Sequence, residues 1–415
     1  MEPSREGVLA LVSSATGPLS PHLKAFVNSL IERRYSVISL RTKTWHAVAF
    51  DDWLAKRHID LSELADSHIE LFHCRSYQPR RDCRSEPRCH EVAELRFLLR
   101  YLREHGLCPS PVVAVTPLSD YINNFRNFLL HERGLACGTV DYYCASAKDF
   151  LFYRFGTGAL EVGSLSAKNV VDFIRERARK THPRTLRLTI TGLRALLRYS
   201  LFRGEIHKQL IDAVPAISSW YTTPELPRAI SAEHARCVIN SCDTNTVVGL
   251  RDRAILLLLA RLGLRCAEIK TLHLDDVDWD AGHLRIRGKN GREILMPVPV
   301  DVGEAIAAYL LRGRPESIDR HLFLRVHAPI SGLGSADSVG YIVSNALDRA
   351  GIDTPHRGGH QFRHALAVHM LQQGASLSEI GEVLRHRSLI STSIYARIDI
   401  AALRSLVMPW PGSTP

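Results

Sequence analysis

Six polar side chains in the C-terminal half of this 415-residue chain could together act on a phosphodiester. They are Arg265, Lys289, His360, Arg363, His386 and Tyr395. Two guanidinium groups can hold the non-bridging oxygens of a phosphate and stabilise the charge of its pentavalent transition state. A tyrosine hydroxyl can attack the phosphorus and form a covalent phosphotyrosine. These residue types therefore predict transfer of a phosphodiester to a protein tyrosine.

The same side chains could supply the proton transfers that this reaction needs. The pKa of a free tyrosine is about 10, so its hydroxyl needs a positive environment and a proton acceptor. The leaving group is a sugar alkoxide, which Lys289 could protonate as a general acid. The sequence contains neither a carboxylate cluster suited to Mg²⁺ nor a GxxxxGK[ST] loop. We therefore expect chemistry that uses no metal, ATP or other cofactor.

The order and spacing of these residues resemble the tyrosine recombinase (phage integrase-like) family. The matching stretches are GLRCAEI at 263–269, GKNGRE at 288–293, HQFRHALAVHML at 360–371 and the run from Leu384 to Tyr395. The resemblance implies that Arg265 and Arg363 bind the scissile phosphate. It also implies that Glu268 supports the environment of Arg265.

The resemblance implies distinct roles for the other four residues. Lys289 would protonate the 5′ oxygen, and His360 would be the acid/base partner near the tyrosine. His386 would hydrogen-bond a phosphate oxygen. Tyr395 would be the nucleophile that forms a 3′-phosphotyrosine.

Two positions depart from the family pattern. Arg385 stands where many members have glycine, so the local turn could differ. Arg397 stands where many members have histidine. Each motif alone also has a structural explanation: Arg265 as a surface charge at a helix end, and Tyr395 as a core aromatic. Their joint order favours the active-site interpretation.

The function that the resemblance implies is that of a site-specific DNA recombinase or integrase, typical of a transposon or phage-like mobile element. Such an enzyme cuts one strand per active site, passes through a Holliday junction, and needs four protomers on two sites of double-stranded DNA. Two alternatives stay open: a type IB-like topoisomerase with the same chemistry, and a catalytically silent DNA-binding partner of other recombinases. Relaxation of supercoils without site preference would favour the first alternative. Absence of a covalent adduct would favour the second.

The elements that must position these residues follow from hydrophobic spacing. Apolar residues recur at intervals of three and four, which predicts amphipathic helices. Alternation in Leu284–Arg287 and from Ile294 to Val300, around Asn290-Gly291, predicts a β-hairpin with Lys289 at its tip. The sequence thus predicts a mainly α fold with a small β-sheet, in which helical core-binding domains precede a tyrosine-recombinase catalytic domain. The helices expected beyond residue 229 span 232–242, 247–262, 302–311, 339–350, 361–373 and 376–384.

A repeat of about 100 residues organises the N-terminal half. LRFLLRY at 95–101 returns as LRALLRY at 193–199, with six of seven residues identical at an offset of 98. We therefore predict that 20–107 is an extra helical domain, an apparent duplicate of the core-binding domain at 117–205. This extra domain would extend the DNA footprint or contact a neighbouring protomer. The remaining parts are an N-terminal segment at 1–19, a linker at 206–228, the catalytic domain at 229–396 and a C-terminal tail at 397–415.

The C-terminal tail follows the tyrosine directly and carries an apolar stripe that includes Ile398 and Leu403. In the resembled family such tails pack on a neighbouring protomer, whereas docking on its own protomer is the alternative here. A basic run at 175–187 would face DNA phosphates, although a solvated helix face is the simpler explanation. Its candidate DNA-binding residues are Arg175, Arg177, Arg179, Lys180, Arg184 and Arg187.

Charge and composition fit this interpretation. The 53 Lys and Arg residues exceed the 43 Asp and Glu residues, giving a formal net charge of +10 and a pI near 9.3. An excess of this size fits a polyanion such as DNA. The longest apolar run, Ala254–Ala260, is too short to cross a bilayer, and no secretion signal is evident. We therefore expect a cytoplasmic, nucleoid-associated bacterial protein.

The nine cysteines show no disulfide-type spacing, which favours a reducing compartment. One cluster of soft ligands, formed by His73, Cys74, Cys83, Cys89 and His90, could hold zinc. Its spacing matches no usual zinc pattern, and the interval is rich in arginine. We therefore favour a basic loop with incidental thiols and expect no metal.

Overall fold

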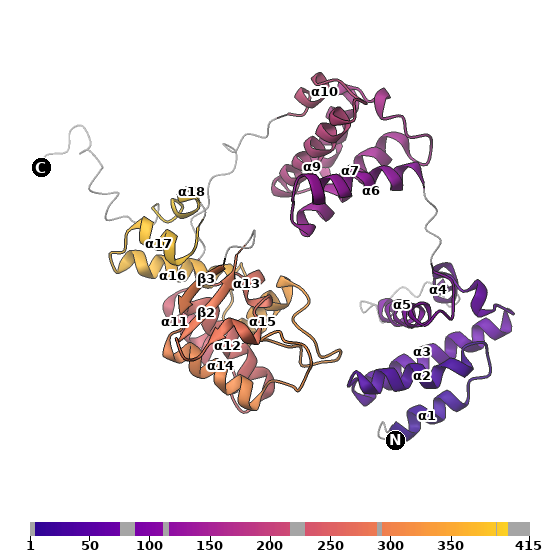
Figure 1. Ribbon diagram of the computed structural model, residues 1–415, viewed down its shortest axis with the longest axis horizontal. Coiled ribbons are helices and arrows are strands. Elements are labelled where there is room, and N and C mark those ends of the chain that lie inside the picture. The colour runs from indigo at the N-terminus through magenta and orange to yellow at the C-terminus, as the bar shows by residue number, and fades with distance from the viewer. Residues whose placement is uncertain are drawn as a thin grey trace, which may run out of the picture. The chain divides into compact units, whose positions relative to one another are not determined.

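The computed structural model describes residues 5–74, 88–110, 116–215, 229–288, 293–386 and 388–396. Three groups of helices follow one another along the chain, each around a separate hydrophobic core (Figure 1). The middle group belongs to a compact unit of its own at 111–223. None of the described helices is both long and apolar enough to span a lipid bilayer.

The first group is a bundle of five helices with one 3-10 turn. Within the predicted N-terminal segment at 1–19, the first helix contributes Val8 and Val12 to the core of this bundle, where they are 2% and 8% exposed. Its apolar residues recur every four positions, so one face can be buried. The elements are α1 (Arg5–Ser13), α2 (Ser20–Glu32), α3 (Val37–Lys56), the 3-10 turn Leu61–Glu63, α4 (Asp66–Cys74) and α5 (Arg88–Glu104).

From its first helix to α9, the second group follows the order of the first group from α2 to α5, with an added π-helical turn and a final short helix. One unexpected feature is that Leu210 and Val214, within the predicted linker at 206–228, belong to the core of this group. Another is a break in the basic run at 175–187, which spans the end of one helix and the start of the next. Pro183 explains the break, because proline starts a helix well but disfavours helical geometry at the residue before it. The elements are α6 (Pro117–Asn127), a π-helical turn Phe128–Glu132, α7 (Cys137–Phe155), the 3-10 turn Val162–Ser164, α8 (Ala167–Lys180), α9 (Pro183–Phe202) and α10 (Gln209–Asp212).

The two bundles bury aromatic residues at equivalent positions. In the first bundle the ring centroids of Phe26 and Tyr101 lie 5.2 Å apart, and in the second those of Phe125 and Tyr199 lie 5.3 Å apart. A further edge-to-face pair recurs as well, at 5.0 Å for Phe50 with Phe72 and at 5.2 Å for Phe150 with Phe173. Such pairs fix how the helices pack. We therefore interpret the first bundle as a second copy of the middle one.

The third group surrounds a helix that is apolar on nearly every side. In α12 (Val247–Arg261) every residue from Ala254 to Leu259 is at most 3% exposed, as expected for a helix at the centre of a domain. Ser231 caps the start of α11 (Ala232–Asn240), the helix that precedes α12. Its side chain accepts a hydrogen bond from the backbone N–H of His234. The other helices are α11 (Ala232–Asn240), α13 (Cys266–Lys270), α14 (Val300–Arg312), α15 (Ala336–Arg349), α16 (His360–Gln372), α17 (Leu377–Val383) and α18 (Leu389–Thr392).

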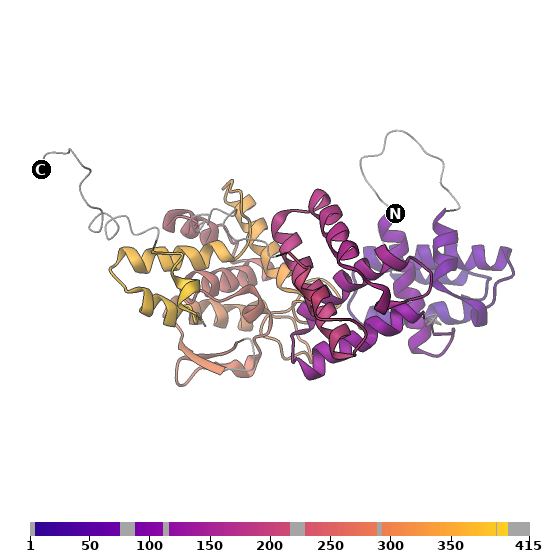
Figure 2. The ribbon, with the colours of Figure 1, turned by 90° about the horizontal axis from the view of Figure 1, so that it is seen from above.

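A small antiparallel sheet of three strands lies against one side of these helices (Figure 1, Figure 2). Its strands are β1 (Val277–Asp278), β2 (His283–Arg287) and β3 (Glu293–Pro297). Arg287 pairs with Glu293 at the end of the β2–β3 ladder. The predicted hairpin is therefore present up to this pair. Its predicted Asn290-Gly291 turn and Lys289 lie outside the described residues.

Candidate active site

Arg265 stands at the start of α13, where the chain leaves the central helix. Its backbone N–H donates to Glu268 Oε2 at 2.9 Å, and its Nη1 donates to Glu268 Oε1 at 2.7 Å. The Glu268 side chain is 6% exposed, whereas that of Arg265 is 38% exposed. One turn of helix thus suffices to fix Arg265, because the carboxylate caps the helix and binds the guanidinium together. The guanidinium remains open to a ligand.

Arg363 lies in the first turn of α16 and is only 4% exposed. Its two terminal nitrogens donate to the backbone carbonyls of Gly263 and Leu384. Burial first, and then the charges of Arg265 and Arg385, lower the pKa of Arg363 to about 9. Arg363 therefore stays protonated at neutral pH. A guanidinium that is buried yet charged suits the recognition of a phosphate.

Gly263 allows the end of α12 to approach closely both α16 and the turn after α17. Its φ is +55°, in the left-handed region that favours glycine. A Cβ atom at this position would lie 2.8 Å from a methyl carbon of Leu384 and 3.0 Å from one of Leu366. The carbonyl of Gly263 can reach Arg363 because no side chain separates α12 from the helices behind it.

Tyr395 follows α18 and is 1% exposed, in a small core with Ile380 and Leu384. Its hydroxyl lies 2.8 Å from Nδ1 of His364. Burial raises the pKa of Tyr395, and the charge of Arg363 opposes that shift. The hydroxyl therefore lies beside the imidazole of His364, and the positive charge of Arg363 acts on it.

His386 lies beside the tyrosine on the turn that follows α17. Its Nδ1 is 2.8 Å from Oγ1 of Thr392, and its ring stacks on that of Tyr395 with centroids 6.4 Å apart. Burial, followed by the charge of Arg363 and of other cations, lowers the pKa of His386 to about 4. The ring is therefore neutral at pH 7. Because Nδ1 is occupied by Thr392, Nε2 is the nitrogen left to bind a ligand.

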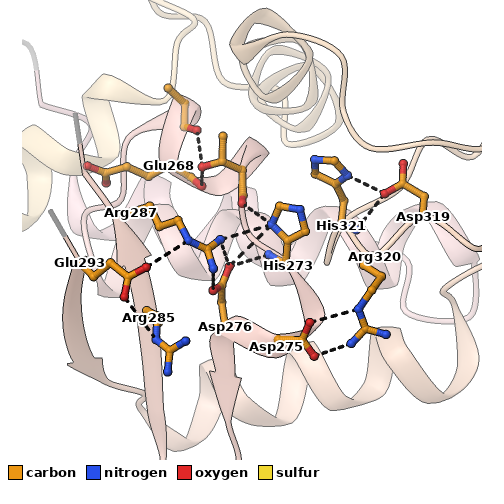
Figure 3. A network of polar contacts seen from close by, with 12 residues as sticks. Glu268, His273, Asp275, Asp276, Arg285, Arg287, Glu293, Asp319, Arg320 and His321 are labelled. Atoms are coloured by element: carbon orange, nitrogen blue, oxygen red, sulfur yellow. Dashed lines mark hydrogen bonds and ion pairs between the residues drawn. The ribbon is translucent and has the colours of Figure 1, made fainter. Parts of the chain in front are cut away.

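A network of charges anchors the base of the hairpin (Figure 3). Arg287 Nη1 donates to Asp276 Oδ2 at 2.9 Å, and its Nε lies 3.4 Å from Glu293 Oε1. The Asp276 side chain is 1% exposed, so this ion pair holds the end of β2 against the body of the domain. The two ends of the segment 288–292 are thereby fixed. Lys289 itself lies within that segment and outside the described residues.

The predicted site residues are thus placed as follows. Arg265, Glu268, Arg363, His386 and Tyr395 are brought together by α13, α16 and the segment after α17. His360 is the first residue of α16 and is exposed.

The predicted DNA-binding residues lie on the middle bundle. Arg175, Arg179, Lys180 and Arg187 are exposed there, while Arg177 is partly buried and binds Asp149. The side chain of Arg184 is outside the described part of the chain.

Two residues of the site were missed from the sequence. His364 contacts the tyrosine hydroxyl, and its position directly after Arg363 on a helix was the available signal. Arg385, noted only as a departure from glycine, donates to Glu268 Oε2 at 3.1 Å and is 6% exposed. No local sequence pattern could predict that contact, because Arg385 and Glu268 lie 117 residues apart in the chain.

No three His, Cys, Asp or Glu side chains are grouped to hold a metal ion in the part of the chain that the structure describes. Of the cysteine cluster considered above, Cys74 is exposed at the end of α4. Cys83 lies outside the described residues, as does the side chain of Cys89.

Proteins with similar sequences include integrases and recombinases. Residues 228–401 match the model of the phage integrase family. Over 97% of both chains, the protein is 39% identical to y4rA of Sinorhizobium fredii, described as an integrase/recombinase. It is 27% identical to the tyrosine recombinase XerD of Listeria monocytogenes, over 70% of this chain and 97% of XerD.

A crystal structure of the XerH site-specific recombinase bound to a palindromic difH substrate shares the fold. The TM-score is 0.55 at 18% identity, over 75% of this chain and 93% of XerH. The family model matches the domain that carries Arg265, Arg363 and Tyr395, and the likeness to an integrase/recombinase extends over 97% of the chain. The chain therefore belongs to the tyrosine recombinase family.

Proposed function

We propose that the protein is a site-specific DNA recombinase that cuts and rejoins strands through a covalent 3′-phosphotyrosine. The observation that carries the proposal is the Tyr395 hydroxyl 2.8 Å from Nδ1 of His364, the residue that directly follows the buried Arg363 on α16. A positive group at that place stabilises both the phenolate and the transition-state phosphate. Arg265, which is more exposed, supplies the second guanidinium for the other non-bridging oxygen.

The reaction can be written with its protons in place. The Tyr395 oxygen attacks the phosphorus, its proton passes to Nδ1 of His364, and the bond to the 5′ oxygen breaks. Lys289 protonates the departing 5′ oxygen, while Nε2 of His386 binds a phosphate oxygen in its protonated tautomer. Attack by a 5′ hydroxyl from another strand reverses these steps and releases the tyrosine. The phosphodiester is conserved throughout, so the proposal requires neither ATP nor a metal.

Strand exchange between two duplexes sets the number of protomers. Four strands must be cut and each protomer offers one tyrosine, so we propose a tetramer on two DNA sites. The middle bundle would hold each duplex through exposed basic residues such as Arg175, Arg179 and Arg187. We further propose that the enzyme acts at the bacterial nucleoid for a transposon or phage-like element.

A suicide-substrate assay tests the proposal. The protein is mixed with a pool of nicked duplexes that tile the DNA on both sides of its gene, and covalent adducts are isolated under denaturing conditions. We expect an adduct with the wild-type protein and none with Tyr395→Phe, which keeps the ring and its packing. Absence of any wild-type adduct, with DNA binding intact, would instead support a silent DNA-binding partner. Relaxation of supercoiled plasmid without site preference would support a topoisomerase.

A further inference from the structure

Arg385 occupies a backbone position that glycine usually fills. Its φ is +55°, and it follows α17 directly after Leu384. The N–H of Arg385 donates to the carbonyl of Glu382 at 2.9 Å, and the N–H of His386 donates to that of Gly381 at 2.8 Å. These two bonds form a Schellman motif, in which a side chain at the position of Arg385 is strained. The contacts of this arginine must offset that strain.

The Arg385 side chain turns inward and joins two distant segments. It is 6% exposed. Nη2 donates to Glu268 Oε2 at 3.1 Å and to the carbonyl of Gly263 at 3.3 Å, and Nη1 donates to the carbonyl of Leu262 at 3.3 Å. The turn that carries His386 is therefore tied to the segment that leads into Arg265.

A single buried carboxylate lies between two guanidinium groups at this point. Glu268 Oε1 accepts from Arg265 and Oε2 accepts from Arg385. One negative charge cannot neutralise two positive charges, so the trio keeps a net positive charge although each arginine has a partner. Without Arg385 the whole negative charge of Glu268 would act on Arg265, and the pair would be neutral.

We propose that Arg385 is a positioning residue for phosphate binding: it holds Glu268 between itself and Arg265, which fixes Arg265 and preserves its attraction for the scissile phosphate. The inference rests on the proposed function. Arg385 acts through Glu268, because Oε2 of that carboxylate accepts from Arg385 while its Oε1 accepts from Arg265. Arg265, at 38% exposed, is the arginine that DNA can reach.

The experiment uses two substitutions that keep the turn. Glycine and asparagine both accept positive φ, so Arg385→Gly and Arg385→Asn remove the guanidinium without straining the backbone. We expect single-turnover adduct formation to slow by about 10-fold or more, with the affinity for the intact duplex changed by less than about 3-fold. Equal adduct rates for the wild type and both variants would overturn the inference.

Arg34 provides a matched control. It also has positive φ, at +60°, in the same kind of turn after α2, and its side chain is 58% exposed. Arg34→Gly removes an arginine from an equivalent backbone position far along the chain from the site. We expect its adduct rate to equal that of the wild type. A decrease in the adduct rate as large as that of Arg385→Gly would show that replacing any arginine at such a turn slows the reaction. That result would overturn the inference.

A substrate with a methylphosphonate at the cleavage position distinguishes two roles of Arg385: positioning Arg265 for the phosphate, and general support of the fold. It replaces one charged non-bridging oxygen with a methyl group, so the transition state no longer needs the full pair of guanidiniums. We expect Arg385→Gly to slow this reaction much less than the reaction of the ordinary phosphate. Equal slowing on both substrates would overturn the inference and leave the proposed function standing. Failure of the wild type to form any adduct would overturn the proposed function and the inference with it.

Discussion

The hydroxyl oxygen of Tyr395 and Nδ1 of His364 lie 2.8 Å apart, and the two rings meet edge to face. Burial, followed by the charges of His360 and Arg363, lowers the pKa of His364. The ring is therefore neutral at pH 7, and an unprotonated Nδ1 can accept the tyrosine proton. Since burial also raises the pKa of Tyr395, its hydroxyl keeps that proton until the reaction begins.

Replacing His364 should slow the attack on the phosphate. Proton transfer by a positioned side chain typically contributes at least about 100-fold, so we expect a decrease of that order in adduct formation by His364→Ala. His369→Ala is the matched control, because His369 is exposed on the same helix. Single-turnover kinetics on the nicked duplex measures both variants. An unchanged rate for His364→Ala would remove His364 from the proton pathway.

The depressed pKa of His386, about 4, predicts how stability depends on pH. Its pKa in the unfolded chain is about 6.5, so the unfolded chain binds a proton more readily than the native one. The contribution of neutral His386 is fully present above pH 6.5 and is lost as the pH falls from 6.5 toward 4. Thermal unfolding across this window should therefore show a shallower decline for His386→Gln than for the wild type. Parallel curves for the two proteins would contradict the shift.

Removing the charge of Glu268 should destabilise the third helical group. Glu268→Gln leaves Arg385 buried without its carboxylate, which we expect to lower the free energy of unfolding by about 3 kcal/mol. Asp301→Asn is the control, because the ion pair of Asp301 with Arg261 is exposed and should contribute less than about 1 kcal/mol. Urea denaturation followed by circular dichroism measures both. Similar losses for the two variants would contradict the structural role of Glu268.

The role of Lys289 can be tested through the leaving group. A sulfur in place of the 5′ bridging oxygen leaves as a thiolate, which needs no proton. We expect Lys289→Ala to slow cleavage of the ordinary duplex by about 100-fold and to cleave the sulfur-containing duplex nearly as fast as the wild type. Lys56→Ala, at an exposed position of the first bundle, should match the wild type on both. Equal defects on the two substrates would rule out the general-acid role.

The first bundle, which we predict to be a duplicate of the middle one, should contribute measurably to DNA binding or assembly. Its core residues form a cluster of their own, so the chain that begins at residue 113 retains the other cores. We expect this shortened protein to protect a shorter stretch of DNA or to assemble with fewer protomers than the full chain. Nuclease footprinting and light scattering on the same duplex measure the two properties, with thermal unfolding as the control for folding. An unchanged footprint together with unchanged assembly would contradict both roles.

The sequence predicted the mainly helical fold with its small sheet because the relevant signals are local. The apolar stripe of α12, the cap at Ser231 and the alternation of β2 and β3 each lie within a few residues. Each family motif likewise lies within one short run of the chain. What escaped prediction depends on distant partners or on backbone conformation. His364 meets Tyr395 across 31 residues.

Arg385 shows most clearly why sequence reasoning stops short. In the sequence, Arg385 lacks the conformational freedom of glycine, which predicted only that the local turn could differ. In the structure the backbone adopts φ +55° nevertheless, and the buried side chain finds its acceptors in Glu268 and Gly263. A strained backbone can be offset by contacts that only the folded chain provides. That balance has no signature in residue type or spacing.

The burial of Tyr395 bears on the fidelity of this enzyme toward DNA in general. With 1% of the residue exposed, a duplex that merely collides with the site meets the guanidinium of Arg265 but no accessible phenol. Under the proposed function, the described segment 388–396 would have to shift before the Tyr395 hydroxyl could meet a phosphate. If the proposed function holds, this burial would protect unrelated DNA from accidental nicking by shape rather than by charge.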